Sequence, residues 1–385
     1  MRFPEFSGEW KKCTINDLAT VVGGGTPDTT VKSYWGGDIQ WFTPSEIGKN
    51  KYVDFSKRTI TRDGLDNSSA KLLPLHTILL SSRATVGECS IASNECTTNQ
   101  GFQSLIAKQC NIDFLYYLIQ TKKKDLIRNA CGSTFLEISA NEIRKIKVAV
   151  PVQNEQEQIA KLLSLIDERI ATQNKIIEKL QSLIKGLVDE LMTVLLKGKL
   201  YPFSSFYIKA GEGGTPTTSV VEYYTEGTIP FIKIEDLSCK YLTNNKDFIT
   251  ELGMQKSSAW LIPSKSVIYS NGATIGAISI NEYPVCTKQG ILGIVPNTNI
   301  NVEYLYLLMS SSYFSKEISR IITEGTMKTA YLKDINHIKC PLPSMAQQKN
   351  ITNLTSSIEE KLSIEQELLR FLNLQKQYLL HMIFI

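Results

Sequence analysis

Two long stretches of the chain place apolar residues three or four positions apart, which is the spacing of one face of an α-helix. The first stretch runs from residue 153 to 197 and contains no proline and only one glycine, Gly186. The second runs from 345 to 381. Each predicts a long helix with a coiled-coil stripe. The first stripe consists of Ile159, Leu162, Ile166, Ile170, Ile177, Leu180, Ile184, Leu187, Leu191 and Val194, and the second of Ile351, Leu354, Ile358, Leu362, Leu369, Leu372 and Leu379.

These two helices are expected to pair with each other, because each carries an apolar stripe that water would otherwise contact. At about 1.5 Å per residue they would be roughly 65 Å and 55 Å long. An antiparallel pair of this length would form a stiff spacer between the other parts of the chain. Gln173 and Glu365 interrupt the stripes. A polar residue there can fix the helix register, and an exposed edge position for both explains the interruption equally well.

The rest of the chain has a different pattern, in which short apolar runs alternate with glycine and proline. Runs such as 78–80 and 267–269 predict strands separated by turns. Apolar residues at spacings of three and four predict short helices near 113–129 and 302–322. These parts are therefore expected to be α+β domains.

The chain also repeats itself. Gly24-Gly25-Thr26-Pro27 returns 189 positions later as Gly213-Gly214-Thr215-Pro216. The same offset relates Ser68-Ser69-Ala70 to Ser257-Ser258-Ala259, Ala84-Thr85-Val86-Gly87 to Ala273-Thr274-Ile275-Gly276, and Gln100-Gly101 to Gln289-Gly290. Matches in the same order across the whole unit indicate a tandem duplication. The predicted order is a first α+β domain over 1–150, a long helix over 151–198, a second α+β domain over 199–343 and a second long helix over 344–385.

Length and composition agree with this organisation. The chain has 385 residues, of which 42% are hydrophobic and 21% charged, as in ordinary folded proteins of two or more domains. The net charge of +4 neither requires nor excludes a polyanionic partner. Most of the excess lies in 1–150, which carries 19 basic and 15 acidic side chains.

Cysteine and histidine usage argues against a structural metal. The eight cysteines contain no C-x-x-C pair, and there are three histidines. The first residues lack the apolar core of a signal peptide, and no apolar run is long enough to span a bilayer. We therefore expect a cytoplasmic protein with reduced cysteines and no membrane association.

No motif in the sequence supports catalysis. After Gly23-Gly24-Gly25 comes Thr-Pro-Asp, so the phosphate-binding lysine of a P-loop is missing. A nucleophile elbow, a zinc-protease helix and the Asn-Pro-Pro-aromatic motif of amino-methylating enzymes are also missing. The sequence thus predicts a binding protein.

The Gly-Gly-Thr-Pro turns admit two interpretations. The glycines can permit a positive φ in a tight turn, or they can let the backbone approach a phosphate group. The aromatic residues that follow are expected to pack in the core, because strands favour aromatics. They are Tyr34, Trp35, Trp41 and Phe42 in the first copy and Tyr223, Tyr224 and Phe231 in the second.

Polar residues on the loops are the candidates for contacts with an outside partner. Arginine and amide side chains make paired hydrogen bonds to base edges, and lysine neutralises phosphates. The candidates are Thr26, Lys32, Arg58, Arg62, Arg83 and Gln100 in the first copy and Thr215, Lys233, Asn271, Lys288 and Gln289 in the second.

Taken in order, the motifs resemble a known family. They are Gly-Gly-Thr-Pro, Tyr34-Trp35-Gly36-Gly37-Asp38-Ile39, Thr43-Pro44-Ser45-Glu46-Ile47, Ser81-Ser82-Arg83-Ala84-Thr85-Val86-Gly87, Asn99-Gln100-Gly101-Phe102, and Pro151 with Glu155-Gln156 opening the long helix. The chain resembles the specificity subunit of a type I restriction-modification system over essentially its whole length. The second copy departs from the pattern at Tyr223-Tyr224-Thr225-Glu226-Gly227, Asn271-Gly272 and Gln347-Gln348. Contacts therefore cannot be transferred from one copy to the other.

The resemblance implies two target recognition domains held apart by an antiparallel coiled-coil spacer. Each domain would read one half of a bipartite site in double-stranded DNA. It also implies two methyltransferase subunits that bind S-adenosylmethionine, and restriction subunits that use ATP and magnesium, while this chain holds no cofactor and performs no chemistry.

Two other functions stay open on the residues alone. One is a stand-alone DNA-modifying enzyme, either a methyltransferase or a nuclease, and the other is a two-domain scaffold that binds a protein or a glycan.

Two finer expectations concern single segments. Arg83 is the best candidate for an arginine that reads guanine in the first domain, or else it touches phosphate or pairs with a carboxylate such as Glu88. The apolar C-terminus, 378–385, must be covered, and Phe3 and Phe6 are the expected cover.

Overall fold

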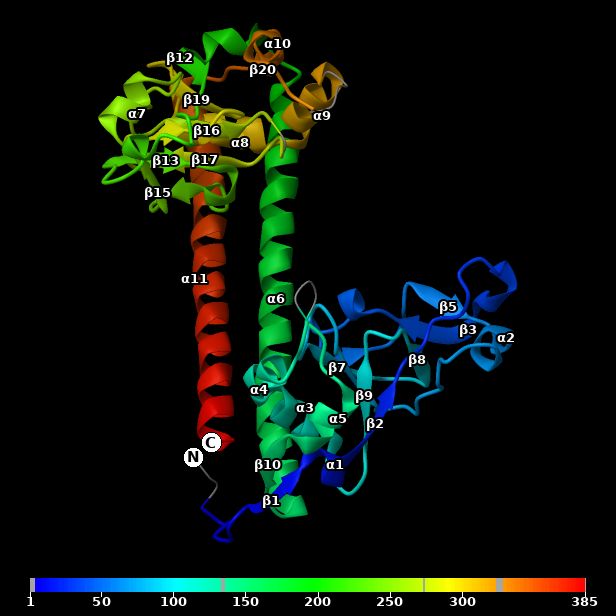
Figure 1. The fold of residues 1–385 in the computed structure, drawn as a ribbon. Helices are drawn as coiled ribbons and strands as arrows, with labels where there is room; N and C mark the ends of the chain where they lie inside the picture. Colours follow the sequence, from blue (N-terminus) through cyan, green and yellow to red (C-terminus); the bar gives the residue numbers. More distant parts are fainter. Residues whose placement is uncertain (1–3, 133–135, 273, 323–327, 385) are drawn as a thin grey trace. The chain divides into compact units, whose positions relative to one another are not determined.

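The computed structural model describes residues 4–132, 136–272, 274–322 and 328–384. It divides into two compact units, one comprising 1–174 with 367–385 and the other 175–366. Each unit contains one α+β domain and one part of each long helix (Figure 1). Among the described residues, no helix is long and apolar enough to cross a membrane.

Among the residues that the structure describes, the sheets of the first unit have the strand orders β2-β9-β6-β7-β4, β5-β3-β8 and β1-β10. Its elements are β1 (Lys11–Thr14), α1 (Ile15–Leu18), β2 (Ala19–Gly23), β3 (Trp35–Phe42), β4 (Tyr52–Val53), β5 (Arg58–Ile60), α2 (Arg62–Asp66), β6 (Ile78–Leu80), β7 (Cys89–Ala92), β8 (Cys96–Thr98), β9 (Gln103–Ala107), α3 (Ile112–Thr121), α4 (Lys123–Arg128), α5 (Ala140–Lys145) and β10 (Lys147–Val150). The strand over 78–80 and the helices near 113–129 were predicted and are confirmed.

The second unit repeats these sheets as β12-β19-β16-β17-β14, β15-β13-β18 and β11-β20. Its elements are β11 (Leu200–Pro202), β12 (Tyr207–Glu212), β13 (Ile229–Ile232), β14 (Tyr241–Leu242), β15 (Asp247–Ile249), α7 (Glu251–Gln255), β16 (Val267–Ser270), β17 (Ile278–Asn281), β18 (Cys286–Thr287), β19 (Ile291–Pro296), α8 (Val302–Ser310), α9 (Ser312–Ile321), α10 (Leu332–Ile335) and β20 (Lys339–Pro341). The duplication read from the sequence is thus a duplication of the fold.

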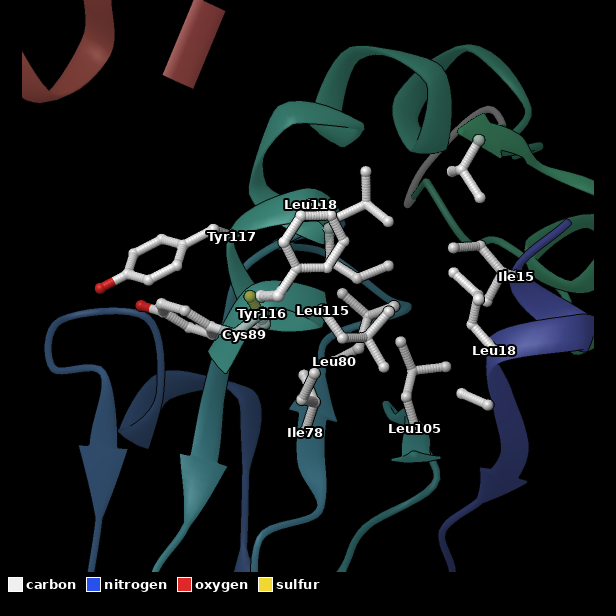
Figure 2. Close-up of a cluster of buried hydrophobic side chains, with 14 of the residues drawn as sticks. Ile15, Leu18, Ile78, Leu80, Cys89, Leu105, Leu115, Tyr116, Tyr117 and Leu118 are labelled. Atoms are coloured by element: carbon white, nitrogen blue, oxygen red, sulfur yellow. The ribbon is translucent and has the colours of Figure 1, made fainter. Parts of the chain in front are cut away.

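The core of the first unit lies between the five-stranded sheet and α3. Figure 2 shows Ile78 and Leu80 of β6 and Leu105 of β9 beneath Leu115 and Leu118 of α3. The amphipathic pattern of α3 explains this packing, since its apolar residues are buried against the sheet. The domain therefore presents its connecting loops, rather than this sheet face, to the outside.

The two long helices are α6 (Gln153–Leu195) and α11 (Met345–Ile383). In the first unit the start of α6 packs with the end of α11, and Lys376 lies 2.7 Å from Asp167. In the second unit the end of α6 and the start of α11 share one core, which contains Val188 and Ile351. Each unit thus pairs the start of one helix with the end of the other, as an antiparallel pair requires.

The predicted stripes are wrong at two positions. Val194 and Leu354 are 61% and 54% exposed, whereas Met192 and Thr355 are buried in their place. An α-helix turns once in 3.6 residues, so a stripe read at strict coiled-coil spacing drifts off the buried face. Gln173 and Glu365 are both buried, which excludes the exposed-edge interpretation.

The apolar C-terminus is part of the core of the first unit. Leu379 and Ile383 are buried there, and the ring of Phe384 lies 5.2 Å from that of Phe114 and 6.0 Å from that of Trp10. The cover seen in the structure thus comes from Trp10 and Phe114. Of the two expected covering residues, Phe6 is only partly buried and Phe3 lies outside the described residues.

Candidate nucleic-acid interface

The Gly-Gly-Thr-Pro turn of the first domain packs against two other loops of the same domain. A Cβ on Gly24 would lie 2.1 Å from the carbonyl oxygen of Asn99, and one on Gly25 would lie 2.3 Å from the backbone of Ser69 and Ala70. Neither glycine has a positive φ. The glycines are therefore required for close backbone packing, and the positive-φ interpretation is wrong.

The second domain builds the same junction. A Cβ on Gly213 would lie 2.1 Å from the carbonyl oxygen of Thr287, and one on Gly214 would lie 2.4 Å from the amide nitrogen of Ala259. This packing explains why Ser68-Ser69-Ala70 recurs as Ser257-Ser258-Ala259. The backbone that the glycines approach belongs to the domain itself, so the phosphate interpretation is not needed to explain the motif.

Two pairs of candidate residues meet at these junctions. The hydroxyl of Thr26 donates a hydrogen bond to Oε1 of Gln100. In the second domain, the backbone amide of Gln289 donates to the hydroxyl of Thr215 at 3.3 Å. Gln100 and Gln289 are exposed, and each threonine is partly exposed. The junction thus presents an amide side chain at the surface of each domain.

An arginine stacked on tryptophan lies beside the junction in the first domain. Cζ of Arg58 is 3.5 Å from the ring centroid of Trp35, whose ring stands at 90° to that of Trp41. Both indoles are anchored, because Trp35 donates to the carbonyl of Asp28 at 3.1 Å and Trp41 to that of Gly25 at 2.9 Å. The exposed guanidinium therefore rests on an anchored aromatic ring.

The equivalent position of the second domain carries the opposite charge. In β3 and β5, Trp41 is paired with Arg58, and in β13 and β15, Phe231 is paired with Asp247. The carboxylate of Asp247 lies 2.9 Å from Nζ of Lys233, and this hydrogen bond raises the pKa of Lys233. The two domains thus differ in charge at the same place on the same scaffold.

The other candidates of the first domain are spread over its surface. Arg83 is exposed and lies 3.6 Å from Glu137, not Glu88, which pairs with Lys123. Arg62 is paired with Asp66 at 3.2 Å within α2. Lys32 is exposed.

One candidate of the second domain is misplaced. Asn271 is fully buried, and its Nδ2 donates to the carbonyl of Ala330 at 3.1 Å. The expected contact of Asn271 with an outside partner is therefore wrong, because its side chain does not reach the surface. It instead bonds a backbone carbonyl within the domain. Lys288 is exposed.

Sequence reasoning missed the platform role of Trp35. It assigned all seven aromatics to the core, and Trp41, Phe42 and Phe231 are indeed buried. Trp35 is only partly buried and carries Arg58 on its face. No spacing rule links these two residues, since they are cross-strand neighbours in the three-stranded sheet.

The buried cysteines are expected to be weakly reactive thiols. Burial raises the pKa of the Cys89, Cys96, Cys110 and Cys340 thiols to about 12 and that of Cys286 to about 11. Thiols with such pKa values carry almost no thiolate at neutral pH. Among the described residues, no group of three His, Cys, Asp or Glu side chains is placed to hold a metal ion.

A model of a known protein family matches this chain. The profile described as "Type I restriction modification DNA specificity domain" matches the chain twice, over residues 7–182 and 206–373. Together the matches span most of both units.

Similar proteins carry related names. The type I restriction enzyme MjaIX specificity subunit of Methanocaldococcus jannaschii is 29% identical over 382 residues, covering 92% of this chain and 88% of its own. The EcoR124I/EcoR124II specificity subunit of Escherichia coli is 29% identical over 175 residues, 43% of each chain.

Solved structures with a similar fold include the type I restriction-modification S subunit from M. genitalium, with a TM-score of 0.55 and 19% identity. The match covers 100% of this chain and 99% of that one. A chain from a study of complex assembly and conformational transition in the type I R-M system has a TM-score of 0.61 at 14% identity and covers 98% of both chains.

Proposed function

Because the chain belongs to the type I restriction-modification DNA specificity family, we propose that its two α+β domains read the two halves of one bipartite DNA sequence. The observation that carries this proposal is the pair of junctions described above. Both domains keep the same backbone packing, yet Arg58 in one is replaced by an Asp247–Lys233 pair in the other. Similar scaffolds with different surface chemistry suit two unequal half-sites.

The proposed DNA-facing residues are the exposed or partly exposed candidates. They are Thr26, Lys32, Arg58, Arg62, Arg83 and Gln100 in the first domain and Thr215, Lys233, Lys288 and Gln289 in the second. Arginine and amides would read base edges, and the lysines would neutralise phosphates. Asn271 is excluded because it is buried.

The long helices are proposed to serve as the spacer. The domain boundaries that we propose are 1–150 and 199–343 for the recognition domains and 151–198 and 344–385 for the helices. A spacer of fixed length would impose a fixed number of base pairs between the half-sites. The specific complex would then reject targets whose half-sites are correct but wrongly spaced.

The partners follow from the family. We propose that two methyltransferase subunits and the restriction subunits assemble on this chain in the cytoplasm. S-adenosylmethionine would bind to the methyltransferase subunits, and ATP and magnesium to the restriction subunits. The chain itself would supply sequence recognition and a docking platform.

Methylome sequencing tests the proposal directly. A host that carries this chain with its partner subunits should acquire methyladenine at a single bipartite sequence, and a host that carries the partners alone should not. The same motif in both hosts, or none in either, would contradict the proposal.

Two further measurements separate the alternative functions. Methyl transfer by the isolated chain in a filter assay would favour a stand-alone enzyme, whereas we expect none. DNA binding by the complex should weaken steeply with salt, because phosphate contacts release counterions. A flat salt dependence would instead favour a scaffold for protein or glycan.

A further inference from the structure

A mostly buried lysine, Lys51, joins the first recognition domain to its long helix. Lys51 precedes β4, and its side chain is only 11% exposed. Its Nζ lies 2.7 Å from the Asp113 carboxylate at the start of α3 and 2.6 Å from the Ser164 hydroxyl on α6. These three residues form what we call the first lysine node, which links a domain loop, a domain helix and a long helix.

The second domain repeats this arrangement with its own chemistry. Lys240 precedes β14 and is 14% exposed, and its Nζ lies 2.6 Å from Glu303 on α8 and 2.5 Å from Glu359 on α11. These residues form the second lysine node. The dipeptides Lys51-Tyr52 and Lys240-Tyr241 are separated by the repeat offset of 189 residues. Both copies therefore keep the lysine, although its partner on the long helix differs.

The tyrosine after each lysine completes the node. Tyr52 donates to Asp113 at 2.6 Å, and Tyr241 donates to Glu303. Burial and these hydrogen bonds raise the pKa of both phenols, so the phenols remain donors at neutral pH. Burial acts to raise the pKa of Glu303, but the hydrogen bonds from Lys240 and Tyr241 outweigh it and leave that pKa below its usual value.

In the first unit the contacts extend to the other long helix. Nζ of Lys51 lies 4.7 Å from the ring centroid of Tyr117, and the Tyr117 hydroxyl donates to Asp167 on α6 at 2.6 Å. Asp167 in turn lies 2.7 Å from Nζ of Lys376 on α11. Figure 2 shows the hydroxyls of Tyr116 and Tyr117 at one edge of the aliphatic core, directed away from it. The node therefore sits where the core ends and the helix pair begins.

A mostly buried ionic node of this kind fixes the orientation of the domain more than it adds to the free energy of unfolding. Desolvation offsets much of the attraction between buried charges, so well-packed apolar residues often stabilise a fold equally well. Apolar contacts are non-directional. An ammonium group that bonds one oxygen on the domain and one on the long helix instead restricts rotation of the domain against that helix. The same lysine in both copies therefore points to orientation as its role.

We propose that the two lysine nodes hold each recognition domain at a set angle on its long helices, which makes Lys51 and Lys240 positioning residues for the half-site spacing. This inference rests on the proposed function. A shift of the DNA-facing loops by about 3.4 Å corresponds to one base-pair step. Loss of a node should therefore let the complex accept neighbouring spacings without changing which bases it reads.

The test uses the full chain assembled with its methyltransferase subunits. Lys51→Met and Lys240→Met each keep the aliphatic stem and remove the charge. Lys49→Met and Lys246→Met remove a charge from nearby exposed positions and serve as controls. Methylation is measured on duplexes that carry the mapped half-sites with the gap changed by one or two base pairs.

The node variants should methylate neighbouring gaps to within about tenfold of the native gap, with unchanged base preference in both half-sites. The wild type and the controls should use one gap only. Lys51→Arg retains the charge and should restore much of the gap discrimination. Node variants that fold, assemble and keep strict gap selection would overturn the inference.

A second measurement is independent of DNA and of assembly. Spin labels are attached to the full chain through Asp66→Cys and Lys161→Cys, both exposed positions, with Cys13, Cys131 and Cys239 replaced by serine. They report the distance between the first domain and α6, which changes when the domain rotates against the helix. Lys51→Met should broaden the distance distribution, and Lys49→Met should not. If the wild-type complex methylates no bipartite sequence, the proposed function alone is refuted. If Lys51→Met leaves the distance distribution unchanged, the positioning role of the node is refuted.

Discussion

Arg58 and Arg83 are the two exposed arginines most suited to reading a base, and their surroundings differ. Cζ of Arg58 lies 3.5 Å from the ring centroid of Trp35, whose indole is anchored to the backbone. Nε of Arg83 forms an ion pair with the carboxylate of Glu137, at a distance of 3.6 Å. A guanidinium held on an aromatic face loses less conformational freedom on binding than a mobile one. We therefore expect Arg58, rather than Arg83, to be the arginine that reads guanine.

Replacing Arg58 with alanine should lower discrimination at one position of one half-site by about 1–3 kcal/mol. Arg83→Ala should weaken binding to all sequences alike. Both are measured by competition binding against a panel of single-base variants of the mapped target. Uniform weakening in Arg58→Ala, together with a position-specific loss in Arg83→Ala, would return the role to Arg83.

The junction glycines make a second prediction about single residues. Gly24→Ala and Gly213→Ala each place a Cβ 2.1 Å from a carbonyl oxygen, so the backbone must move. We expect each to destabilise its own unit by about 1–3 kcal/mol or more. Gly186→Ala is the matched control. Its Cβ meets nothing within 4 Å, and alanine should stabilise the interior of α6 by about 1 kcal/mol. Urea unfolding of the three variants measures these changes in the free energy of unfolding. An unchanged free energy of unfolding in Gly24→Ala would contradict the packing argument.

Among the elements, α11 contributes side chains to the cores of both units. Its last turns complete the core of the first unit through Leu379 and Ile383, while its first turns pack in the second unit around Ile351. The first unit is therefore formed from two separate pieces of chain, 1–174 and 367–385, whereas the second is the continuous piece 175–366. Damage to the C-terminus should consequently appear in the first domain, which is distant from it in sequence.

Deleting 378–385 should reduce both the stability of the first unit and the assembly of the complex. The deletion removes two buried aliphatic side chains and the ring of Phe384 between Trp10 and Phe114. Leu379→Ala alone should cost about 2–5 kcal/mol, whereas Tyr378→Ala should be close to neutral because Tyr378 is 54% exposed. Thermal unfolding and co-purification with the methyltransferase subunits measure the two effects. Normal values of both in the deletion variant would refute this placement.

For the molecule as a whole, the continuity of the two helices matters most. α6 spans 43 residues and α11 spans 39, and each contributes to both compact units. The buried Gln173 and Glu365 lie within these helices, and polar residues at such positions penalise a shifted register. The helix pair is thus suited to setting a length.

Inserting one heptad into α6 and the facing heptad into α11 should lengthen the spacer by roughly 10 Å. That is about three base pairs at 3.4 Å each. Methylome sequencing should find the same two half-sites separated by a longer gap. An insertion in only one helix should instead impair folding, because it breaks the pairing. An unchanged gap in a folded, active complex would contradict the spacer role.

The amino-acid sequence was sufficient for the features that repeat or have a period. The duplication, the strand at 78–80, the short helices and both long helices all follow from local spacing, because the pattern of apolar residues reflects the geometry of each element. The family resemblance rests on the same ordered motifs. Residue chemistry at the surface was not accessible in this way, because it depends on neighbours that are distant in the chain.

The sequence predicts that Asn271 and Arg83 are both surface loop residues. In the structure Asn271 is buried and bonded to Ala330, whereas Arg83 is exposed beside Glu137. Trp35 was assigned to the core but supports Arg58 from an adjacent strand. The low exposure of Lys51 could not be predicted from the residues around it. Its partners lie on α3 and α6, more than 60 and 110 positions away in the chain. Strand register and helix packing bring such residues together, and no short-range periodicity encodes either.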